Sequence, residues 1–382
     1  MTTEHRIHPD DSHPSILVAG FSTRHIASSA HRAGYRVYAV DHFCDQDLVW
    51  HTRDRMNFEE LEELPQAVAA MERMHDPGGF VPASGAEAIR PTSPVLGTPP
   101  ERVLPFLDKL EIQRFFEENG IPVPALLPPG TYPAMLKPRV ASGGWRNTIV
   151  RSLAEEERWQ GSFPGMPFVR QEIVHGVPSS VSLVADGRRA RAIAVNEQLL
   201  RASDEASFGF CGSITPSDHP LADRMVRCAE KAAGRSGCIG SVGIDFVAGD
   251  DEVYAIEINP RFQGTLDTVE AAISENLFSL HVDACRGVIP EKMPTAGRYA
   301  ARRILFAECD LTVRSDLAPL APVVSDIPWP GSRFGPGEAV VSVHGNGPDR
   351  EAALAVLHRN MNTVRQYMAE WANGGNSRKS SD

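Results

Sequence analysis

The sequence predicts a mixed chain, in which an N-terminal α/β domain with a parallel sheet precedes an α+β region built from antiparallel strands. Three observations predict it. Residues 15–41 read as strand, helix and strand, residues 240–259 hold two alternating runs around a Gly-Asp-Asp turn, and residues 301–357 return to strands that end in a helix. A β-α-β unit implies a parallel sheet. Alternating runs on either side of a tight turn indicate an antiparallel hairpin.

Length and charge limit what the chain can be. Its 382 residues allow about two or three domains. The formal net charge is −11 and no basic block stands out, so we expect no nucleic-acid partner. No apolar run approaches the roughly 18 residues of a membrane span, so we also expect no membrane partner.

The two ends and the cysteines suggest an intracellular setting. Residues 1–14 contain no apolar core, so they are neither a secretory signal nor a transit peptide. We expect residues 1–14 and 373–382 to be disordered tails. The six cysteines show no Cys-x-x-Cys spacing, which argues against a zinc site or a disulfide framework. Free thiols of this kind are typical of a reducing cytoplasm.

The loop between the first predicted strand and its helix is a candidate anion site. It reads Gly-Phe-Ser-Thr-Arg-His from residue 20, which matches one glycine of the Gly-x-Gly-x-x-Gly dinucleotide fingerprint, so a nicotinamide cofactor is disfavoured. The loop opens a helix N-terminus, where backbone N–H groups attract anions. Ser22, Thr23 and Arg24 could hold a substrate carboxylate there. Simple capping of the helix by Ser22 or Thr23 explains the pattern equally well.

A lysine at the end of a short apolar strand forms the second candidate site. Lys137 closes the run Ala-Met-Leu-Lys and is followed by a small loop with two glycines, residues 140–147. Glycines let backbone N–H groups approach phosphates, and the lysine adds a positive charge. The spacing differs from that of a P-loop. A surface hairpin is the alternative interpretation. A second lysine, Lys109, lies on a helix predicted over residues 101–119, and further helices are predicted over 59–75, 220–235 and 268–286.

The hairpin at residues 240–259 gathers oxygen ligands. Glu257 and Asn259 lie two residues apart in one strand, so they point to the same face. Asp245 joins them if the even-numbered apolar residues of both runs share the other face, which requires a loop with an odd number of residues. A hard divalent cation would compensate the two carboxylates, and Arg261 at the strand end could meet a phosphate. An edge strand with a solvated face is the alternative.

Taken in order, these segments resemble the ATP-grasp superfamily of carboxylate–amine and carboxylate–thiol ligases. The resemblance covers about residues 15–310 and depends most on Asp245 with Glu257 and Asn259. It implies ATP as the nucleotide and Mg²⁺ as the metal, with Mn²⁺ as a possible substitute. In the family, an acidic residue often follows the glycine of the hinge turn to bind ribose. Here Val177 follows Gly176, so the ribose contact stays open.

The resemblance also implies a role for each matched residue. The ATP phosphates would be contacted by Lys109 and Lys137, and the lid over them would include Ser142, Gly143 and Gly144. The hinge against adenine would consist of Gln171, Glu172, Ile173 and Val174. One or two metal ions would be ligated by Asp245, Glu257 and Asn259, and Arg261 would face the γ-phosphate and the acyl phosphate. Arg261 and Lys137 would be catalytic. Gln198 follows the hinge strands and is a candidate for substrate binding together with the Ser22–Thr23–Arg24 loop, although a structural role explains it equally well.

The remaining third of the chain is similar to the small C-terminal domain of biotin-carboxylase-like ATP-grasp proteins. Together with the Gly-Phe-Ser-Thr-Arg loop, it resembles a group of predicted ATP-dependent carboligases of archaea and methylotrophic bacteria. The implied division is a Rossmann-like domain, an ATP-grasp lid subdomain, an ATP-grasp nucleotide- and metal-binding subdomain and a β-rich C-terminal domain with a helix. Their expected boundaries are 15–105, 106–167, 168–310 and 311–372.

These features together favour a cytoplasmic ligase that activates a small carboxylate as an acyl phosphate and couples it to an amine. Cofactor or C1 metabolism is a possible setting, and a homodimer is common in the family. Two alternatives stay open, namely a carboxylase that uses bicarbonate and a nucleotide-binding regulator without turnover. The complete Asp245–Glu257–Asn259 set disfavours the regulator.

Overall fold

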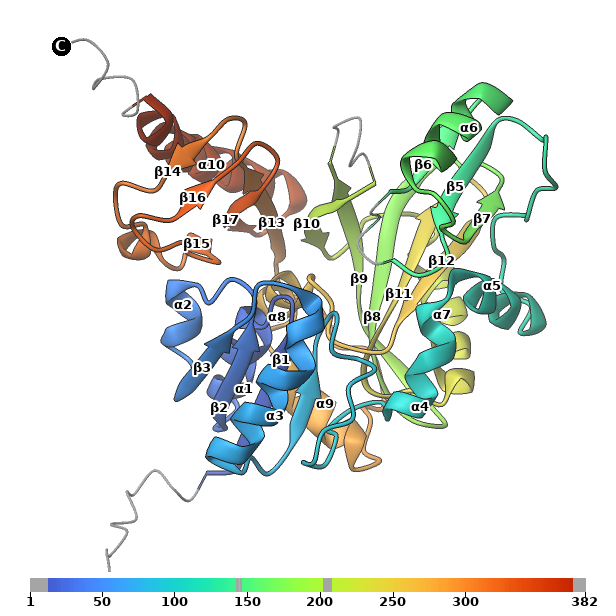
Figure 1. Ribbon diagram of the computed structural model, residues 1–382. Coiled ribbons are helices and arrows are strands. Elements are labelled where there is room, and N and C mark those ends of the chain that lie inside the picture. Colours follow the sequence, from blue (N-terminus) through green and yellow to red (C-terminus); the bar gives the residue numbers. More distant parts are fainter. Residues whose placement is uncertain (1–12, 142–143, 145, 202–207, 374–382) are drawn as a thin grey trace, which may run out of the picture.

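The computed structural model describes residues 13–141, 144, 146–201 and 208–373. The two predicted tails fall almost wholly outside these ranges. Within them the chain forms a four-stranded, an eight-stranded, a three-stranded and a two-stranded sheet. Figure 1 shows the four-stranded sheet beside the eight-stranded one, with the C-terminal helix and the three-stranded sheet at opposite sides of the molecule. The predicted mixture of a parallel N-terminal sheet with antiparallel sheets is confirmed.

The N-terminal sheet is parallel and has the order β3-β2-β1-β4. Its strands are β1 (Ser15–Gly20), β2 (Arg36–Asp41), β3 (Asp54–Asn57) and β4 (Phe80–Pro82), and its helices are α1 (Arg24–Arg32), α2 (Gln46–Val49) and α3 (Leu64–His75), with the 3-10 turn η2 (Leu61–Glu63) before α3. The central strand β1 is buried from Ile16 onwards, as its apolar sequence requires. This confirms the predicted β-α-β unit.

The eight-stranded sheet has the order β12-β11-β8-β9-β10-β13-β17-β15 and all its pairings are antiparallel. The strands are β8 (Val177–Asp186), β9 (Ala190–Leu200), β10 (Phe210–Thr215), β11 (Ile239–Ala248), β12 (Val253–Asn259), β13 (Tyr299–Phe306), β15 (Val324–Ser325) and β17 (Ala339–Gly347). Because β13 pairs with both β10 and β17, the sheet runs on across the boundary expected at residue 310. One rigid sheet therefore links the middle of the chain to its C-terminal part.

Two smaller sheets and the remaining helices complete the fold. The three-stranded sheet has the order β6-β5-β7 and the two-stranded sheet pairs β14 with β16. Their strands are β5 (Ala134–Pro138), β6 (Thr148–Val150), β7 (Phe168–Gln171), β14 (Leu311–Thr312) and β16 (Arg333–Phe334); the remaining helices are α4 (Pro100–Val103), η3 (Leu104–Leu107), α5 (Lys109–Glu118), α6 (Leu153–Ser162), α7 (Ala222–Ser236), α8 (Leu266–Ile273), α9 (Leu277–Cys285), η4 (Ala318–Leu320) and α10 (Arg350–Asn373).

Two helices predicted as continuous are broken. The helix expected over 101–119 divides into α4, η3 and α5, because Asp108 is extended (φ −111°, ψ 117°) and its carboxylate caps α5 by accepting the Leu110 N–H at 2.9 Å. The helix expected over 268–286 divides into α8 and α9 at Ser274, whose φ of 58° is left-handed. The first break makes Lys109 the opening residue of a helix rather than one in its interior.

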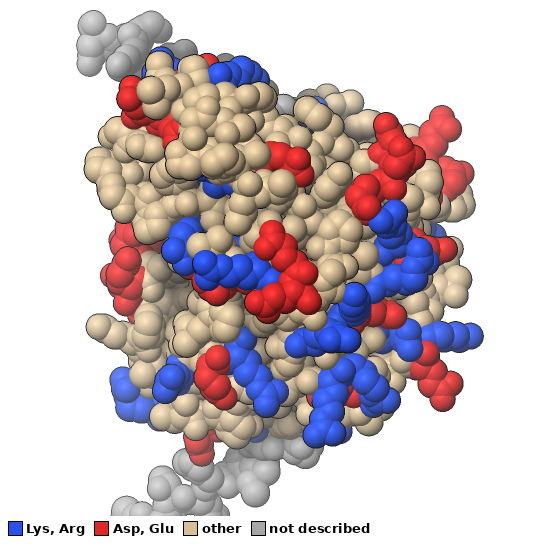
Figure 2. Space-filling model, turned by 90° about the vertical axis from the view of Figure 1, so that its right-hand side faces the viewer, with Lys and Arg blue, Asp and Glu red and all other residues tan. Residues whose placement is uncertain are grey.

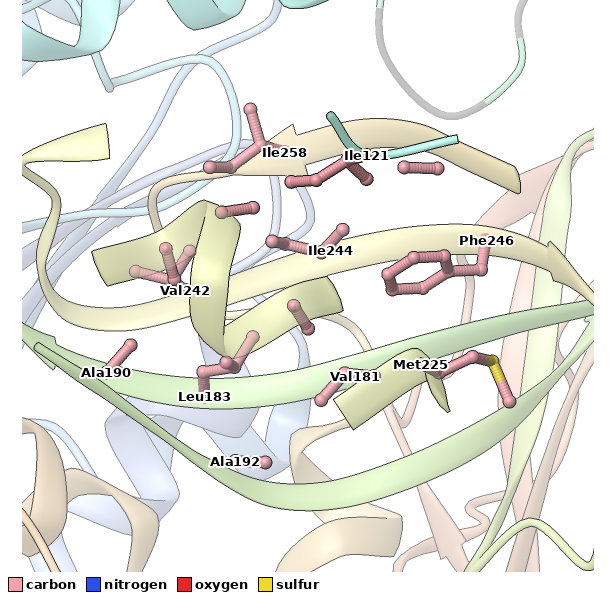
Figure 3. Packing of buried hydrophobic residues seen from close by; sticks show 14 of the residues in the cluster. Ile121, Val181, Leu183, Ala190, Ala192, Met225, Val242, Ile244, Phe246 and Ile258 are labelled. Carbon is pink, nitrogen blue, oxygen red and sulfur yellow. The ribbon is translucent and has the colours of Figure 1, made fainter. Parts of the chain in front are cut away.

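Helix α7 packs on one face of the large sheet and forms its main core. Figure 3 shows Val181 and Leu183 of β8 with Val242, Ile244 and Phe246 of β11 directed into this cluster. The odd residues of β8 and the even residues of β11 thus share one apolar face, as expected for alternating strands. The other face carries Ser180, Ser182 and Asn196, which are all buried. This polar face is the one that bears Asp245, because Asp245 pairs with Ser180 and Ser180 with Asn196.

Acidic and basic side chains are interspersed over the face of the molecule shown in Figure 2. At the turn between β8 and β9, a surface hollow of about 460 Å³ is lined by five basic and two acidic side chains, namely Arg188, Arg189, Arg191, Lys231, Arg235, Glu230 and Glu291. This hollow lies after Asp186, at the end of β8 away from Ser180. Among the helices that the structure describes, none is long and apolar enough to cross a membrane.

A buried ionic cluster joins three parts of the chain. Arg24 of α1 donates from Nη2 to Asp267 Oδ2 at 2.6 Å and from Nε to Asp326 Oδ1 at 2.9 Å. Asp267 belongs to α8 and Asp326 follows β15. Arg302 of β13 completes the cluster by donating to Asp326 Oδ2 at 2.7 Å. Both guanidinium groups are buried, so this ionic cluster ties the N-terminal sheet to α8 and to the β13–β15 side of the large sheet.

The charges of this ionic cluster compensate one another. Burial alone would raise the pKa of Asp267, but the attraction of Arg24 and then of Arg302 outweighs burial and holds the pKa well below its ordinary range. The pKa of Asp326 is lowered against burial in the same way, again by Arg24 and Arg302. Such carboxylates stabilise the fold above their unfolded-state pKa of about 4 and lose that contribution as the pH falls further.

Removing one partner of this cluster should therefore destabilise the protein strongly. We expect Arg24→Ala to lower the free energy of unfolding by about 3–5 kcal/mol, because two buried carboxylates each lose a buried cationic partner and only Arg302 remains to compensate them. Urea unfolding followed by tryptophan fluorescence measures the change. Arg114→Ala is the matched control, since Arg114 is 57% exposed and pairs with Glu111 on the surface, where a loss of at most about 1 kcal/mol is expected. Equal losses in the two variants would contradict a supporting role for Arg24.

Candidate active site

The hairpin of β11 and β12 brings the predicted metal ligands together. Asp245 lies directly opposite Glu257, and Asn259 lies opposite Gly243, one pleat away on the same face. The predicted convergence of the three side chains is therefore found in the fold. It does not arise from a loop with an odd number of residues, because Ala248 pairs with Val253 and the loop between them has four.

A β-bulge supplies the missing residue. The register shifts between Asp245 and Phe246, so that Phe246 faces Ala255 and Ile256 is the extra residue in β12. On the turn side of the bulge the buried residues are the odd-numbered Val253 and Ala255. Beyond the bulge the buried residue is the even-numbered Ile258, so the buried face switches from odd to even positions there. The condition that the even-numbered apolar residues of both runs share one core face therefore fails in β12, where Tyr254 and Ile256 are both only partly buried.

Asp245 is the most perturbed carboxylate of this group. It accepts hydrogen bonds from Gln198 Nε2 at 2.8 Å and from Asn259 Nδ2 at 3.1 Å. Burial raises its pKa to about 7, and the negative charge of Glu257 adds to the rise, while its two amide donors and Arg261 oppose it. Two carboxylates held side by side in this way favour the binding of a cation.

Two buried lysines face these carboxylates. Lys109, at the start of α5, donates from Nζ to the carbonyl oxygen of Ala141 and lies 3.7 Å from Glu257 Oε1. Lys137 is 8% exposed in β5, and its pKa falls to about 8 because of burial first and the charge of Lys109 second. The Lys109 N–H also donates to Arg139 O at 2.8 Å, which ties α5 to the end of β5. Positive and negative groups thus meet between the small sheet and the large one.

Arg261 is held by a residue that the sequence interpretation missed. Its Nε donates to Glu87 Oε1 at 2.6 Å, and its Nη2 donates to Asn259 Oδ1 at 3.1 Å. Glu87 lies in the loop after β4, where its other oxygen accepts the Gly85 N–H at 2.7 Å. The two ion-pair partners are 174 positions apart, and no spacing rule connects them. Only the loop's place after a buried strand, Phe80–Pro82, could have pointed to it.

The predicted hinge links the two sheets. Gln171 ends β7, is buried, and donates from Nε2 to Gln113 Oε1 at 2.6 Å. Glu172 pairs with Ala125 through its backbone N–H at 2.8 Å and through its side chain at 2.9 Å. Ile173 and Val174 are half-buried and lead to Gly176, where an added Cβ would lie 2.2 Å from the Ala248 carbonyl oxygen. Glycine is required there because the two backbones touch.

The predicted lid is only partly described. Ser142 and Gly143 lie outside the described residues. Gly144 is left-handed, with φ of 74°, and a Cβ on it would lie 2.2 Å from the Phe208 carbonyl oxygen. The end of this loop therefore packs directly against the chain that enters β10.

The predicted anion loop at the start of α1 is engaged in other contacts. Thr23 donates to Asp41 Oδ2 from its backbone N–H at 2.5 Å and from its hydroxyl at 2.8 Å. It does not cap the helix through its side chain, so the capping alternative is wrong for Thr23. Arg24 belongs to the buried ionic cluster, and Ser22 precedes both as a half-buried residue. Substrate binding by these three residues stays a prediction.

Seven predicted residues are thus connected by contacts or by direct electrostatic influence, namely Lys109, Lys137, Gln198, Asp245, Glu257, Asn259 and Arg261. Within the described ranges, no group of three or more His, Cys, Asp and Glu side chains is placed to hold a metal ion. A divalent cation would depend on two carboxylates and an amide oxygen. This donor set fits Mg²⁺, which commonly takes few protein oxygens and completes its shell with phosphate and water.

Comparison with known proteins defines the class of this fold and site. Residues 106–265 match the ATP-grasp domain family. This part of the chain is an ATP-grasp domain, and it contains all seven connected residues.

Among relatives in sequence, the chain is 23% identical over 354 residues to the uncharacterized protein MJ0776 of Methanocaldococcus jannaschii, covering 86% of this chain and 87% of that protein. It is 25% identical over 364 residues to the carbamoyl phosphate synthase large chain of Streptomyces avermitilis, covering 86% of this chain. It spans only 31% of that large chain.

Solved structures extend the likeness of the fold over nearly the whole chain. The biotin carboxylase of Campylobacter jejuni superposes with a TM-score of 0.72 at 15% identity, covering 89% of each chain. The L-amino acid ligase of Bacillus licheniformis superposes with a TM-score of 0.69 at 15% identity, covering 91% of this chain and 97% of that one.

The carboxylate pair can be tested without knowing the substrates. We expect Glu257→Gln to weaken binding of Mn²⁺ in the presence of ADP by at least about tenfold, because the site loses one of its two negative charges. Electron paramagnetic resonance of free Mn²⁺ measures the affinity. Glu252→Gln is the control, since Glu252 lies just before β12 but pairs with Arg224. The assignment fails if Glu257→Gln binds Mn²⁺ as tightly as Glu252→Gln.

Proposed function

We propose that the protein is an ATP-dependent ligase that activates a small carboxylate as an acyl phosphate and joins it to an amine, releasing ADP and phosphate. The observation that carries this proposal is the meeting of Lys109, Lys137 and Arg261 with the Asp245–Glu257 pair at the junction of two sheets. Three cations and two carboxylates in one partly buried site suit a polyphosphate with its metal ion.

In this proposal the nucleotide lies between the small and the large sheet. Adenine lies against the hinge of Gln171, Glu172, Ile173 and Val174, and the lid residues 142–144 cover the phosphates. Lys109 and Lys137 contact the phosphates. Bound phosphate oxygens would favour the charged form of Lys137, whose pKa burial has lowered to about 8.

The first chemical step transfers a phosphoryl group. A carboxylate oxygen of the substrate attacks the γ-phosphorus, and the bond to the bridging oxygen of ADP breaks. One or two Mg²⁺ ions, or Mn²⁺, held by Asp245, Glu257 and Asn259 would neutralise charge on the phosphates when bound. Arg261 faces the transferred group, and Glu87 and Asn259 hold its guanidinium in place. Positioning and charge neutralisation carry most of such a reaction.

The second step forms the C–N bond. The amine nitrogen attacks the acyl carbon, phosphate leaves, and the nitrogen gives up a proton. We propose that Gln198 contributes to the substrate side, since it lies beside Asp245 on the polar face of the sheet. The division into units at 15–105, 106–167, 168–310 and 311–372, and a place in the cytoplasm, belong to the same proposal.

A carboxylase that uses bicarbonate as the acid is the second candidate. The observation that favours it is the likeness of the fold to a biotin carboxylase across 89% of both chains. Bicarbonate would take the place of the organic carboxylate in the first step, and the same residues would act.

Trapping of the activated acid separates these possibilities. With ATP, Mg²⁺ and hydroxylamine in place of the amine, the true acid should yield its hydroxamate and one ADP per turnover. We expect Lys137→Ala to slow ADP formation by about 100-fold or more, because a cation at the transferred phosphate is lost. Lys231→Ala, at an exposed position of α7, should act like the wild type.

The products decide between the candidates. Hydroxamate from an organic acid supports the ligase, and ADP formation that depends on bicarbonate alone supports the carboxylase. Release of AMP and pyrophosphate, or tight ATP binding without turnover on broad pools of acids and amines, would contradict the proposed reaction.

A further inference from the structure

Four ring-bearing residues follow the carboxyl ends of three neighbouring strands in the N-terminal sheet. Phe21 follows β1, His42 and Phe43 follow β2, and Phe58 follows β3. The rings of Phe21 and His42 stack with centroids 4.6 Å apart and planes within 11°, and Phe43 meets each of them edge-on at 5.2 and 4.8 Å. His42 is anchored by a 3.1 Å hydrogen bond between its Nδ1 and the Phe58 carbonyl oxygen. The rings thus form an ordered surface.

Two of these rings are unusually open to solvent. Phe21 is 41% exposed and Phe43 is 39% exposed, whereas Phe58 beneath them is 3% exposed. Leaving large apolar rings in water forfeits the stabilisation that their burial would give. Adjacent exposed aromatic side chains commonly mark a binding surface. The core of the N-terminal sheet does not account for Phe21 or Phe43, because neither belongs to its buried clusters.

Contacts with the rest of the chain lie on both sides of these rings. On one side, the Phe21 N–H donates to Ser84 O at 2.7 Å, and the loop of Ser84 leads to Glu87, which holds Arg261. On the other side, Gln46 N donates to Ile327 O at 2.9 Å, next to β15. Figure 1 shows α2, which follows β2, at the edge of the N-terminal sheet that faces the C-terminal unit. The rings therefore lie along the edge where the three parts meet.

This edge is where a ligand is expected in a fold of this kind. In open parallel α/β sheets, ligands bind outside the carboxyl ends of the strands. Here that edge offers aromatic faces at β1 and β2 and, beyond β4, the guanidinium of Arg261 beside Glu87. An aromatic surface next to a cation suits a molecule with a planar ring at one end and a carboxylate at the other.

We propose that Phe21, His42 and Phe43 form an aromatic platform that binds the planar ring of the carboxylic acid substrate, with its carboxylate directed toward Arg261. This inference rests on the proposed function, since it names the class of acid that the ligase activates. It assigns the choice of acid to the N-terminal sheet, while the ATP-grasp domain supplies the nucleotide and the metal.

A matched pair of acids tests the platform without turnover. 3-Phenylpropanoate and 3-cyclohexylpropanoate have the same chain and charge and differ in the aromaticity of the ring. Saturation-transfer NMR on the full chain with Mg²⁺ and ADP, at millimolar acid, should show the phenyl acid binding about two- to tenfold more tightly, because it can stack. Simple hydrophobic burial predicts the opposite order, since the saturated ring carries more hydrogen and is the more apolar.

Two substitutions test whether the preference for the phenyl acid depends on the aromatic platform. Phe21→Leu keeps an apolar side chain without a ring face and should abolish the preference for the phenyl acid. Trp50→Leu is the control, because Trp50 is an exposed aromatic residue of the same domain, 47% exposed, outside the stacked group. Both variants are checked by their urea midpoints, so a folding defect is not mistaken for lost binding.

The results separate this inference from the proposed function. Equal affinity for the two acids, no detectable binding of either, or a preference that survives Phe21→Leu would overturn the platform. Hydroxamate formation from non-aromatic acids alone would also overturn it and leave the ligase standing. A phenyl preference that depends on Phe21, without ADP formation from any acid, would keep the platform as a ring-binding site and refute the ligase.

Discussion

The buried ion pairs of Arg24 with Asp267 and Asp326 are the constraint on which the arrangement of the molecule depends. Each of these three residues comes from a different part of the chain, and none is near another in sequence. The N-terminal sheet has no hydrogen-bonded strand in common with the large sheet. Its orientation therefore depends on contacts other than strand pairing, and a charged cluster that must be fully paired allows fewer geometries than an apolar contact.

Electrostatics organise the candidate site on a smaller scale. The site places two carboxylates opposite each other and two lysines near each other. Burial first, and these like charges second, move the pKa of Asp245 up and that of Lys137 down. A ligand that carries both signs of charge, as a metal–polyphosphate complex does, would offset both like-charge contacts together. The polar face of β8 and β9 extends this environment toward the ionic cluster through Ser180, Asn196 and their neighbours.

Local sequence signals were sufficient for some of this and insufficient for the rest. The two-residue period of β12 placed Glu257 and Asn259 on one face, because alternation is a property of the strand itself. Asp245 joins them through the bulge and not through the odd-numbered loop that the sequence argument required. The Lys137 strand was predicted from its short apolar run. The bulge at Ile256 was not, because whether a strand carries an extra residue depends on the packing of Val253 and Ala255 beneath it. The break at Asp108 needed knowledge of its cap and of its partner Arg139.

Long-range partners were beyond local signals altogether. Glu87 is an ordinary loop residue until the fold sets it against Arg261, and no local pattern indicates the two aspartates from distant segments that pair with Arg24. The exposed rings of Phe21 and Phe43 gave no periodic pattern, since they follow strands rather than lie within them. In each case the sequence does not say which strand ends lie next to one another, because that depends on the topology of the fold.

The bulge at Ile256 also governs how the hairpin tolerates change. On the side of the bulge away from the turn, Asp245 pairs with Glu257. This register is set by the turn and the bulge together, and not by the turn alone. A turn of five residues without a bulge would hold the same two carboxylates opposite each other, since it consumes the same number of residues. Two backbone solutions therefore exist for one arrangement of ligands. The length of the turn at residues 249–252 therefore does not by itself set the pairing of Asp245 with Glu257. A change of one residue in that length can be compensated by losing the bulge.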